Sequence, residues 1–144
     1  MTIPDTHYLE CEAIKKLKAK YCRLMDNKQW AEWRDIFTDD FKGTFELPPN
    51  PASVFASPDE LVETNQSILK DAKTVHQIFA PEITLNSDGS ALGIWQQFDF
   101  VRMPRFAFKG YGNYKETYRK CADGQWRIAT IHETRLLVEI LDAS

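Results

Sequence analysis

Apolar residues in the first part of the chain recur at the spacing of an α-helix. Between about Tyr8 and Met25 they fall every three or four positions, at Ile14, Leu17, Tyr21, Leu24 and Met25. Such a stripe marks one face of an amphipathic helix. The lysines of this stretch, at positions 15, 16, 18 and 20, mostly face the other side. The pattern therefore predicts a first helix over roughly 8–25.

Two shorter segments with helical patterns follow. The first carries Trp30, Trp33, Ile36 and Phe37 and is predicted to stop at residues 38–40. An extended stretch, 41–47, then leads into a proline-rich loop at 48–51. The second begins at Ser57-Pro58-Asp59-Glu60, where serine caps, proline suits the first position and Glu60 completes a capping box. We expect that helix to run to about residue 69.

From residue 74 onward the pattern changes to long extended segments. Four strands are predicted over 74–85, 91–101, 106–120 and 126–141, with turn signals at 86–89, 103–105 and 122–125. The order predicts an α+β fold in which a curved antiparallel sheet packs on three helices. Gly93, Gly110 and Gly112 can supply the bends that such long strands need. A sheet curved in this way forms a cone, whose interior is a natural small-molecule pocket.

Length and composition fit one globular domain spanning residues 1–144. The chain is 43% hydrophobic and 27% charged, and its net charge of -3 gives no electrostatic reason to expect nucleic-acid binding. Cys11, Cys22 and Cys121 show no C-x-x-C spacing, so we expect reduced thiols. The start of the sequence lacks the features of a signal peptide, and no apolar run has membrane-spanning length. A cytoplasmic location without membrane contact is the resulting expectation.

The sequence offers no sign of a metal or cofactor. His7, His76 and His132 lack the spacing of paired metal ligands. There is no glycine-rich phosphate loop and no nucleophile elbow. We therefore expect chemistry that needs neither a metal nor a cofactor.

Several stretches together resemble one family. Tyr21-Cys-Arg-Leu-Met-Asp26, followed by Trp30 and by the run 37–40, is similar to the first-helix motif of SnoaL-like proteins. Thr74-Val-His76, then Pro81-Glu-Ile, resembles their strand with a cavity histidine. The segments 94–99, 110–114, 118–128 and 135–136 resemble their later strands and terminal hairpin. The resemblance covers about residues 11–141 and implies the cone-shaped nuclear transport factor 2-like (cystatin-like) fold.

The resemblance also implies a set of site residues. Bile-acid dehydratases and hexachlorocyclohexane dehydrochlorinase use an Asp–His pair for proton abstraction, and Asp26 and His76 match its positions. Tyr21 matches a tyrosine of the dehydratases, and Asp99 matches an acidic residue on the following strand. Scytalone dehydratase is similar but uses two cavity histidines, for which His132 is a weak match. Substrate contacts are expected from three further residues: Trp95, Tyr111 and Arg135.

The chemistry of these residue types supports that interpretation. Histidine is the side chain best suited to accept a proton near neutral pH, and a carboxylate on its other nitrogen fixes the tautomer and stabilises the imidazolium. His76 would be the base, Asp26 its orienting partner and Tyr21 a hydrogen-bond donor. The four tryptophans at positions 30, 33, 95 and 126 suit the core and the wall of a cavity for a flat apolar ligand.

Each assignment has a structural alternative. A histidine on a strand can be purely structural, and Asp26 can simply end a helix, since Asp-Asn is common turn chemistry. Tyr21 lies on the apolar helix face and can be a core residue. Asp99 can face solvent on the outer side of the sheet, and Arg135 can form a surface or interface ion pair.

The preferred hypothesis is a cofactor-free lyase or isomerase, first of all a dehydratase, acting on a small apolar carbonyl compound, polycyclic ones included. Polyketide cyclase and ketosteroid-isomerase chemistry come next. A non-catalytic ligand-binding or dimerisation module is the alternative from another class, and the small subunit of an aromatic dioxygenase shares the fold. We also expect a homodimer or homotrimer formed through the outer face of the sheet. The distance between His76 and Asp26 discriminates between enzyme and module.

Overall fold

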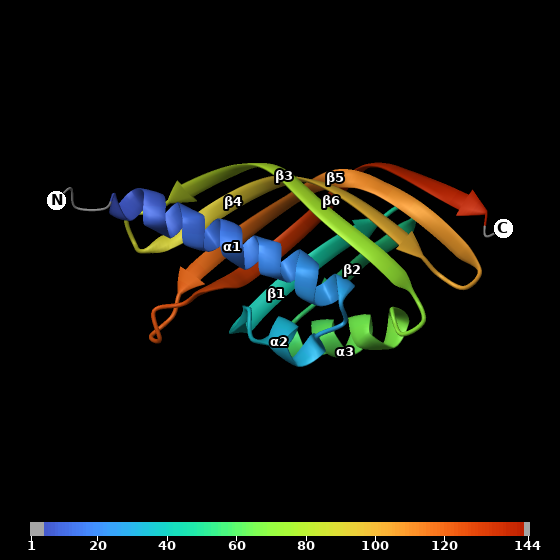
Figure 1. The fold of residues 1–144 in the computed structure, drawn as a ribbon, viewed down its shortest axis with the longest axis horizontal. Coiled ribbons are helices and arrows are strands. Elements are labelled where there is room, and N and C mark those ends of the chain that lie inside the picture. The colour runs from blue at the N-terminus through green and yellow to red at the C-terminus, as the bar shows by residue number, and fades with distance from the viewer. Residues whose placement is uncertain (1–4, 143–144) are drawn as a thin grey trace.

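The computed structural model describes residues 5–142, and nine elements make up these residues (Figure 1). They are α1 (Thr6–Asp26), α2 (Trp30–Arg34), β1 (Phe37–Leu47), β2 (Asn50–Phe55), α3 (Pro58–Ile68), β3 (Lys73–Leu85), β4 (Ser90–Arg102), β5 (Phe106–Lys120) and β6 (Trp126–Asp142). The three helices, the long strands and the curved sheet confirm the predicted α+β fold class. Met1–Pro4, part of the segment assessed for a signal peptide, lie outside the described residues.

α1 forms where its apolar stripe predicts. The Asp5 side chain accepts a hydrogen bond from the His7 N–H and caps the first turn. All five predicted stripe residues are buried. Of the lysines, which mostly face the other side as predicted, Lys18 is the exception, because it is buried on the apolar face with no exposed surface. The helix ends at Asp26, and Lys28 then takes a positive φ of 58° that turns the chain out of it.

The second helix is shorter than predicted, and the next strand begins earlier. α2 ends at Arg34, and Phe37 already belongs to β1, where it lies opposite Ile128 of β6. The Ile128 N–H donates to the carbonyl of Ile36. Pairing with a strand about ninety positions later in the chain therefore ends the helix, which periodicity alone does not reveal. The predicted proline-rich loop is also partly wrong, because residues 50–55 form β2 at the edge of the sheet, where prolines are tolerated.

The six strands lie in the order β2-β1-β6-β5-β4-β3. Four ladders are antiparallel, but β1 and β6 run parallel, so the expectation of a wholly antiparallel sheet was wrong. The cause is connectivity: β1 precedes α3 and inserts beside the last strand rather than beside its neighbour in sequence. The β5–β6 ladder shifts register at Tyr111/Gly112 and at Thr117/Tyr118, which are the irregularities expected where a long sheet bends.

α3 begins as its sequence predicts. The Ser57 hydroxyl accepts a hydrogen bond from the Glu60 N–H at 3.1 Å, and Pro58 occupies the first turn. The Glu60 carboxylate in turn accepts from the Ala56 N–H at 3.1 Å. In the standard capping box the donor is the backbone N–H of the capping residue, here Ser57, so the donor Ala56 lies one residue earlier. The contact fixes the direction in which the chain enters the helix.

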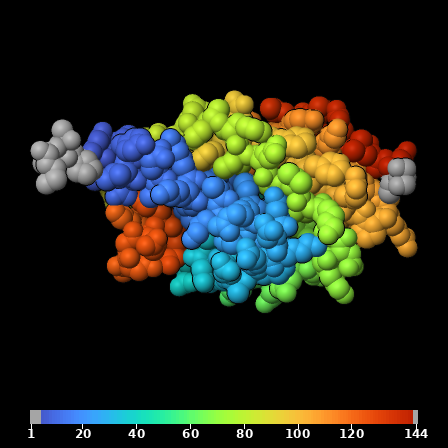
Figure 2. Space-filling model, in the orientation of Figure 1, coloured from blue at the N-terminus to red at the C-terminus, as the bar shows by residue number. Residues whose placement is uncertain are grey.

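The helices lie on the concave side of the sheet and close the cone (Figure 1). Figure 2 shows this side, with α1 crossing the strands and the orange-red β5–β6 turn beside its first half. There Glu10 pairs with Lys120 at 2.6 Å and accepts from the Trp126 ring N–H. The core lies between α1 and the sheet and is rich in aromatic side chains. Within residues 5–142 no helix is both long and apolar enough to span a membrane.

Candidate active site

A cavity of about 250 Å³ opens between the C-terminal end of α1, α3 and the concave face of the sheet. Its walls are mostly apolar, with Phe45, Phe55, Phe106 and Phe108 among the lining side chains. Polar side chains gather on one part of its lining: Tyr21, His76, Asp99, Tyr114, Glu133 and Arg135. A larger surface depression of about 550 Å³ lies between α1 and the β5–β6 turn. It holds no histidine, so the smaller cavity is the candidate site.

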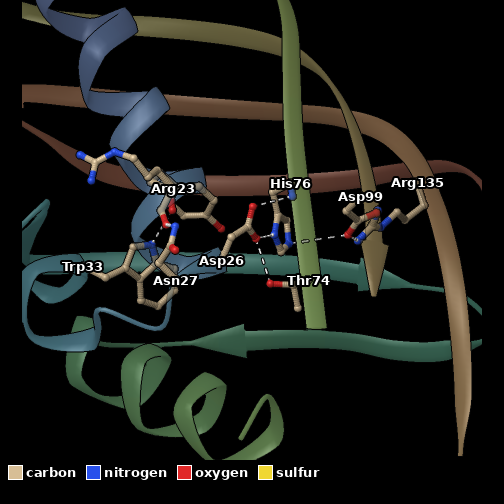
Figure 3. A network of polar contacts seen from close by, with 9 residues as sticks. Arg23, Asp26, Asn27, Trp33, Thr74, His76, Asp99 and Arg135 are labelled. Atoms are coloured by element: carbon tan, nitrogen blue, oxygen red, sulfur yellow. Dashed lines mark hydrogen bonds and ion pairs between the residues drawn. The ribbon is translucent and has the colours of Figure 1, made fainter. Parts of the chain in front are cut away.

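Asp26 and His76 form a close pair at this site (Figure 3). The distance from the ring Nδ1 of His76 to Oδ1 of Asp26 is 2.7 Å. The backbone N–H of the same histidine donates to Oδ2 at 2.9 Å, and the Thr74 hydroxyl donates to Oδ1 at 2.9 Å. The carboxylate is thus held by three donors, which fixes both its orientation and that of the ring.

Secondary structure explains why these residues meet. Asp26 is the last residue of α1, so its side chain projects from the end of the helix toward the neighbouring strand. Thr74 and His76 lie two positions apart on β3 and therefore point to the same, inner face of the sheet. The backbone N–H of His76 thus lies within reach of the helix end.

The pairing determines which ring nitrogen of His76 is free. A carboxylate can only accept hydrogen bonds, so in the neutral ring the proton lies on Nδ1 and Nε2 is left without one. His76 Nε2 lies 3.9 Å from Oδ2 of Asp99, beyond hydrogen-bond distance. Because His76 lines the cavity and Asp26 lies behind it, Nε2 is the atom that can accept a proton from a ligand.

Asp99 and Arg135 form a bidentate ion pair across the sheet. The two oxygens of Asp99 accept from the two terminal nitrogens of Arg135 at 2.6 and 2.8 Å. Asp99 lies on β4 opposite Gly110 of β5, and a Cβ atom at Gly110 would lie 2.2 Å from both partners. The absence of a side chain there leaves the space for the pair. Asp99 thus faces the cavity and is 2% exposed, so its solvent-facing alternative does not hold.

Glu133 adds a second carboxylate to the same guanidinium. Its Oε1 lies 2.8 Å from a terminal nitrogen of Arg135. Burial raises the pKa of Glu133, the charge of Arg135 opposes this, and the charge of Asp99 raises the pKa further. For Arg135, burial lowers the pKa, but hydrogen bonds and charge from Asp99 together with the charge of Glu133 outweigh it and raise the pKa. The guanidinium therefore stays charged.

Tyr21 lies deeper than the other predicted site residues. It is 2% exposed, and burial raises the pKa of its hydroxyl well above the ordinary value. Its ring and that of Tyr114 enclose the Lys18 ammonium, at 3.7 and 3.6 Å from the ring centroids. Lys18 also pairs with Glu116, and neither side chain is exposed. Tyr21 lines the cavity, but as part of a buried polar cluster.

Two predicted substrate contacts are wrong. Trp95 is 3% exposed and does not line the cavity, because its ring N–H donates to the Tyr118 hydroxyl at 2.8 Å inside the core. Tyr111 lies on the outer face of β5, where it packs on Phe98 at 5.2 Å between ring centroids. Strand alternation places it there, since Gly110 and Gly112 take the inner positions. His132, the weak second histidine, is also outside the cavity and bonds Glu46.

Some residues of the site were missed from sequence. Glu133 lies two positions after Ile131 on a strand, and residues two positions apart point to the same face of a sheet. The apolar Ile131 was therefore a signal that Glu133 faces inward. Lys18 carried a signal as well, because it lies one position from Leu17 and three from Tyr21. Nothing local in the sequence pointed to Glu116 as its partner, which is 98 positions away.

Comparisons with known proteins show the family and the fold of this chain. The SnoaL-like domain family matches residues 7–132. A putative scytalone dehydratase from Novosphingobium aromaticivorans DSM 12444 is similar in structure, with a TM-score of 0.82 and 22% identity over 99% of this chain and 93% of that one. A type 2 hexachlorocyclohexane dehydrochlorinase (LinA) is also similar, with a TM-score of 0.82 and 16% identity over 96% and 93%.

The type 3 LinA dehydrochlorinase of Novosphingobium barchaimii LL02 shares the fold too, at a TM-score of 0.79 and 15% identity over 94% of this chain and 92% of that one. Because the identities are low, these structures show only that the fold is shared. The family assignment rests on the match to the SnoaL-like domain, which extends over most of the sequence. This chain therefore belongs to the SnoaL-like family of the nuclear transport factor 2-like superfamily.

Proposed function

We propose that this protein is a lyase or isomerase of dehydratase type that uses His76 to remove a proton next to a carbonyl group. The observation that carries the proposal is the 2.7 Å contact between His76 Nδ1 and Asp26. In the neutral ring this contact places the proton on Nδ1 and leaves Nε2 on the cavity side, which is the geometry that a general base needs. The substrate is a small, largely apolar carbonyl compound, in keeping with the apolar walls.

The proposed steps use only side chains of this chain. Nε2 of His76 takes the proton, and the ring becomes an imidazolium. Asp26 stabilises that charge at 2.7 Å, as an ionised carboxylate on the other nitrogen does in other acid–base sites. The imidazolium then gives this proton to a hydroxyl group on the neighbouring carbon, which leaves as water while the C=C bond forms, and the neutral base is restored. Return of the proton to another carbon gives an isomerisation, so ketosteroid-isomerase and cyclase chemistry remain variants of the same proposal.

Turnover by the wild type and by His76→Ala tests the proposal. We expect the substitution to lower the rate by about 10²–10⁴-fold, the usual value of general-base catalysis, while the thermal unfolding temperature stays close to that of the wild type. His132→Ala is the matched control, because that ring lies outside the cavity. Wild-type rates in His76→Ala would end the dyad mechanism and favour a ligand-binding module.

We further propose that the chain forms a homodimer or homotrimer through the outer face of the sheet. Large apolar side chains are exposed there on neighbouring strands, with Val75 and Phe79 on β3 exposed to 44% and 49%. Leu92 and Ile94 continue the surface on β4. Several large apolar side chains exposed on one face of a sheet favour an interface there.

A further inference from the structure

Arg135 is the one Lys or Arg side chain that lines the cavity among residues 5–142, and its N–H groups are already engaged. Asp99 accepts one N–H from each terminal nitrogen, and the carbonyl of Glu46 accepts from Nε at 3.1 Å, while Glu133 forms an ion pair with one terminal nitrogen at 2.8 Å. A guanidinium carries five N–H groups, so these three hydrogen bonds leave one on each terminal nitrogen, and Asp99 already occupies the side on which the two nitrogens present parallel N–H groups. A ligand carboxylate, which binds arginine best through two parallel N–H groups, finds no such pair free.

We propose that this cavity binds uncharged ligands and excludes carboxylates and phosphates. The reason is that Asp99 and Glu133 hold Arg135, the cation of the cavity, in ion pairs. The inference rests on the proposed function for the location of the site. The inference concerns binding and assigns Asp99 a part in selecting the ligand.

Displacing either carboxylate from Arg135 is costly. Asp99 and Glu133 are 2% and 5% exposed, so neither can turn into water when a ligand acid takes its place. A buried carboxylate that loses its partner keeps its charge without compensation. The pair is also confined sterically, because Gly110 lies against it and any Cβ there would overlap both groups. The guanidinium therefore remains with its two partners.

The sum of charges opposes an acidic ligand as well. With a neutral His76 ring, the acids Asp99 and Glu133 face a single guanidinium, and Asp26 adds a negative charge behind the ring. An incoming anion would meet this field in a cavity of low polarity, where like charges repel most strongly.

Nothing else in the lining would attract an acid. Apart from the polar group, the walls are formed by apolar side chains such as Phe55, Leu69 and Phe108. The neutral polar side chains there, Ser53, Thr64 and Asn65, suit hydroxyl or carbonyl groups. The lining of the cavity is therefore suited to bind an uncharged hydrocarbon that carries hydroxyl or carbonyl groups.

A matched pair of probes tests the inference without any turnover. 2-Acetylnaphthalene is uncharged and 2-naphthoate is its acidic counterpart of similar shape, and calorimetric titration at pH 7.5 gives the affinity of each. We expect the ketone to bind the wild type at least about tenfold more tightly, since like charges in an interface cost several-fold in affinity or more. Wild-type protein that binds naphthoate as tightly as the ketone, or that binds neither probe, overturns the inference.

The variant Asp99→Asn tests whether the ion pair causes the exclusion of acids. It removes a negative charge and releases Arg135, so naphthoate affinity is expected to rise about tenfold or more while ketone affinity changes little. Asp99→Asn/Arg135→Met, which lacks the released cation, should lose that gain. If Asp99→Asn does not fold, Glu133→Gln removes the other carboxyl charge and is expected to shift affinity the same way. A folded variant without any gain contradicts the inference, whereas loss of catalysis alone concerns only the proposed function.

Discussion

Asp26 binds the same histidine twice, accepting a hydrogen bond from the ring of His76 at 2.7 Å and from its backbone N–H at 2.9 Å. The two contacts join the end of α1 to β3 and leave the ring little freedom to rotate. The base would therefore be oriented before a ligand enters, and this arrangement lowers the entropic cost of reaching a reactive geometry.

Asp26→Asn is expected to reduce turnover by about 10²–10⁴-fold, because an amide cannot stabilise imidazolium as a carboxylate does. Combining it with His76→Ala should add little, since residues that act as one unit are far from additive. Rate measurements on both single variants and on the double variant check this. Asp71→Asn, an exposed acid in the turn before β3, serves as the control. Independent, multiplying losses in the double variant would argue against a coupled pair.

Gly110→Ala should destabilise the fold and disturb the site together. Its Cβ would lie 2.2 Å from both Asp99 and Arg135, so the ion pair has to move. Overpacking of this kind costs about 1–3 kcal/mol, measurable by urea unfolding. Gly89→Ala is the comparison, because a Cβ there meets nothing within 4 Å and only its φ of +85° is unfavourable. A Gly110→Ala protein as stable as the wild type would show that the pair can shift without cost.

Lys18→Met should be strongly destabilising, by about 3–5 kcal/mol, because it leaves the buried carboxylate of Glu116 without its cation. Lys18→Met/Glu116→Gln removes both charges and should recover much of that loss, since the amide oxygen that replaces the carboxylate can still accept from the Tyr118 hydroxyl. Chemical denaturation of the two variants gives both values. Equal losses in the single and double variants would contradict the expected recovery.

Stability should depend on pH through Glu133. Its folded pKa is raised, first of all by burial, so its contribution is fully present below the unfolded pKa and is lost as pH rises through the folded one. Glu133→Gln lacks this titration. The free energy of unfolding of the variant relative to the wild type is therefore expected to increase as pH rises above the ordinary glutamate range. Parallel unfolding curves from pH 4 to 8 check this, and a constant difference would contradict it.

Phe79→Lys/Ile94→Lys should dissociate the expected homodimer or homotrimer. Both side chains are exposed on the outer face of the sheet, at 49% and 38%, and charges there remove apolar contact area and repel each other across a symmetric interface. Sedimentation velocity at micromolar concentration measures the state of assembly. A wild type that sediments only as a monomer would contradict the proposal, and Lys115→Glu, an exposed position on the same face, tests for a general charge effect.

Local patterns in the sequence determined most of the elements. The helical stripe ending at Met25, the Ser57–Glu60 cap and the turn at Asn86–Gly89 each depend on neighbouring residues, so they could be read directly and their positions agree with the structure. The placement of Asp26 opposite His76 came from the resemblance to SnoaL-like proteins. No local rule joins two residues that lie 50 positions apart.

The tertiary structure alone decided the rest. The parallel entry of β1 beside β6 shortened α2 and created an edge position for β2, because long-range backbone pairing outweighs short-range propensity. Burial of Lys18 and the sharing of Arg135 between Asp99 and Glu133 likewise depend on partners from distant strands. Charged side chains can enter a core only where such partners exist, and which partners meet is set by sheet order and register.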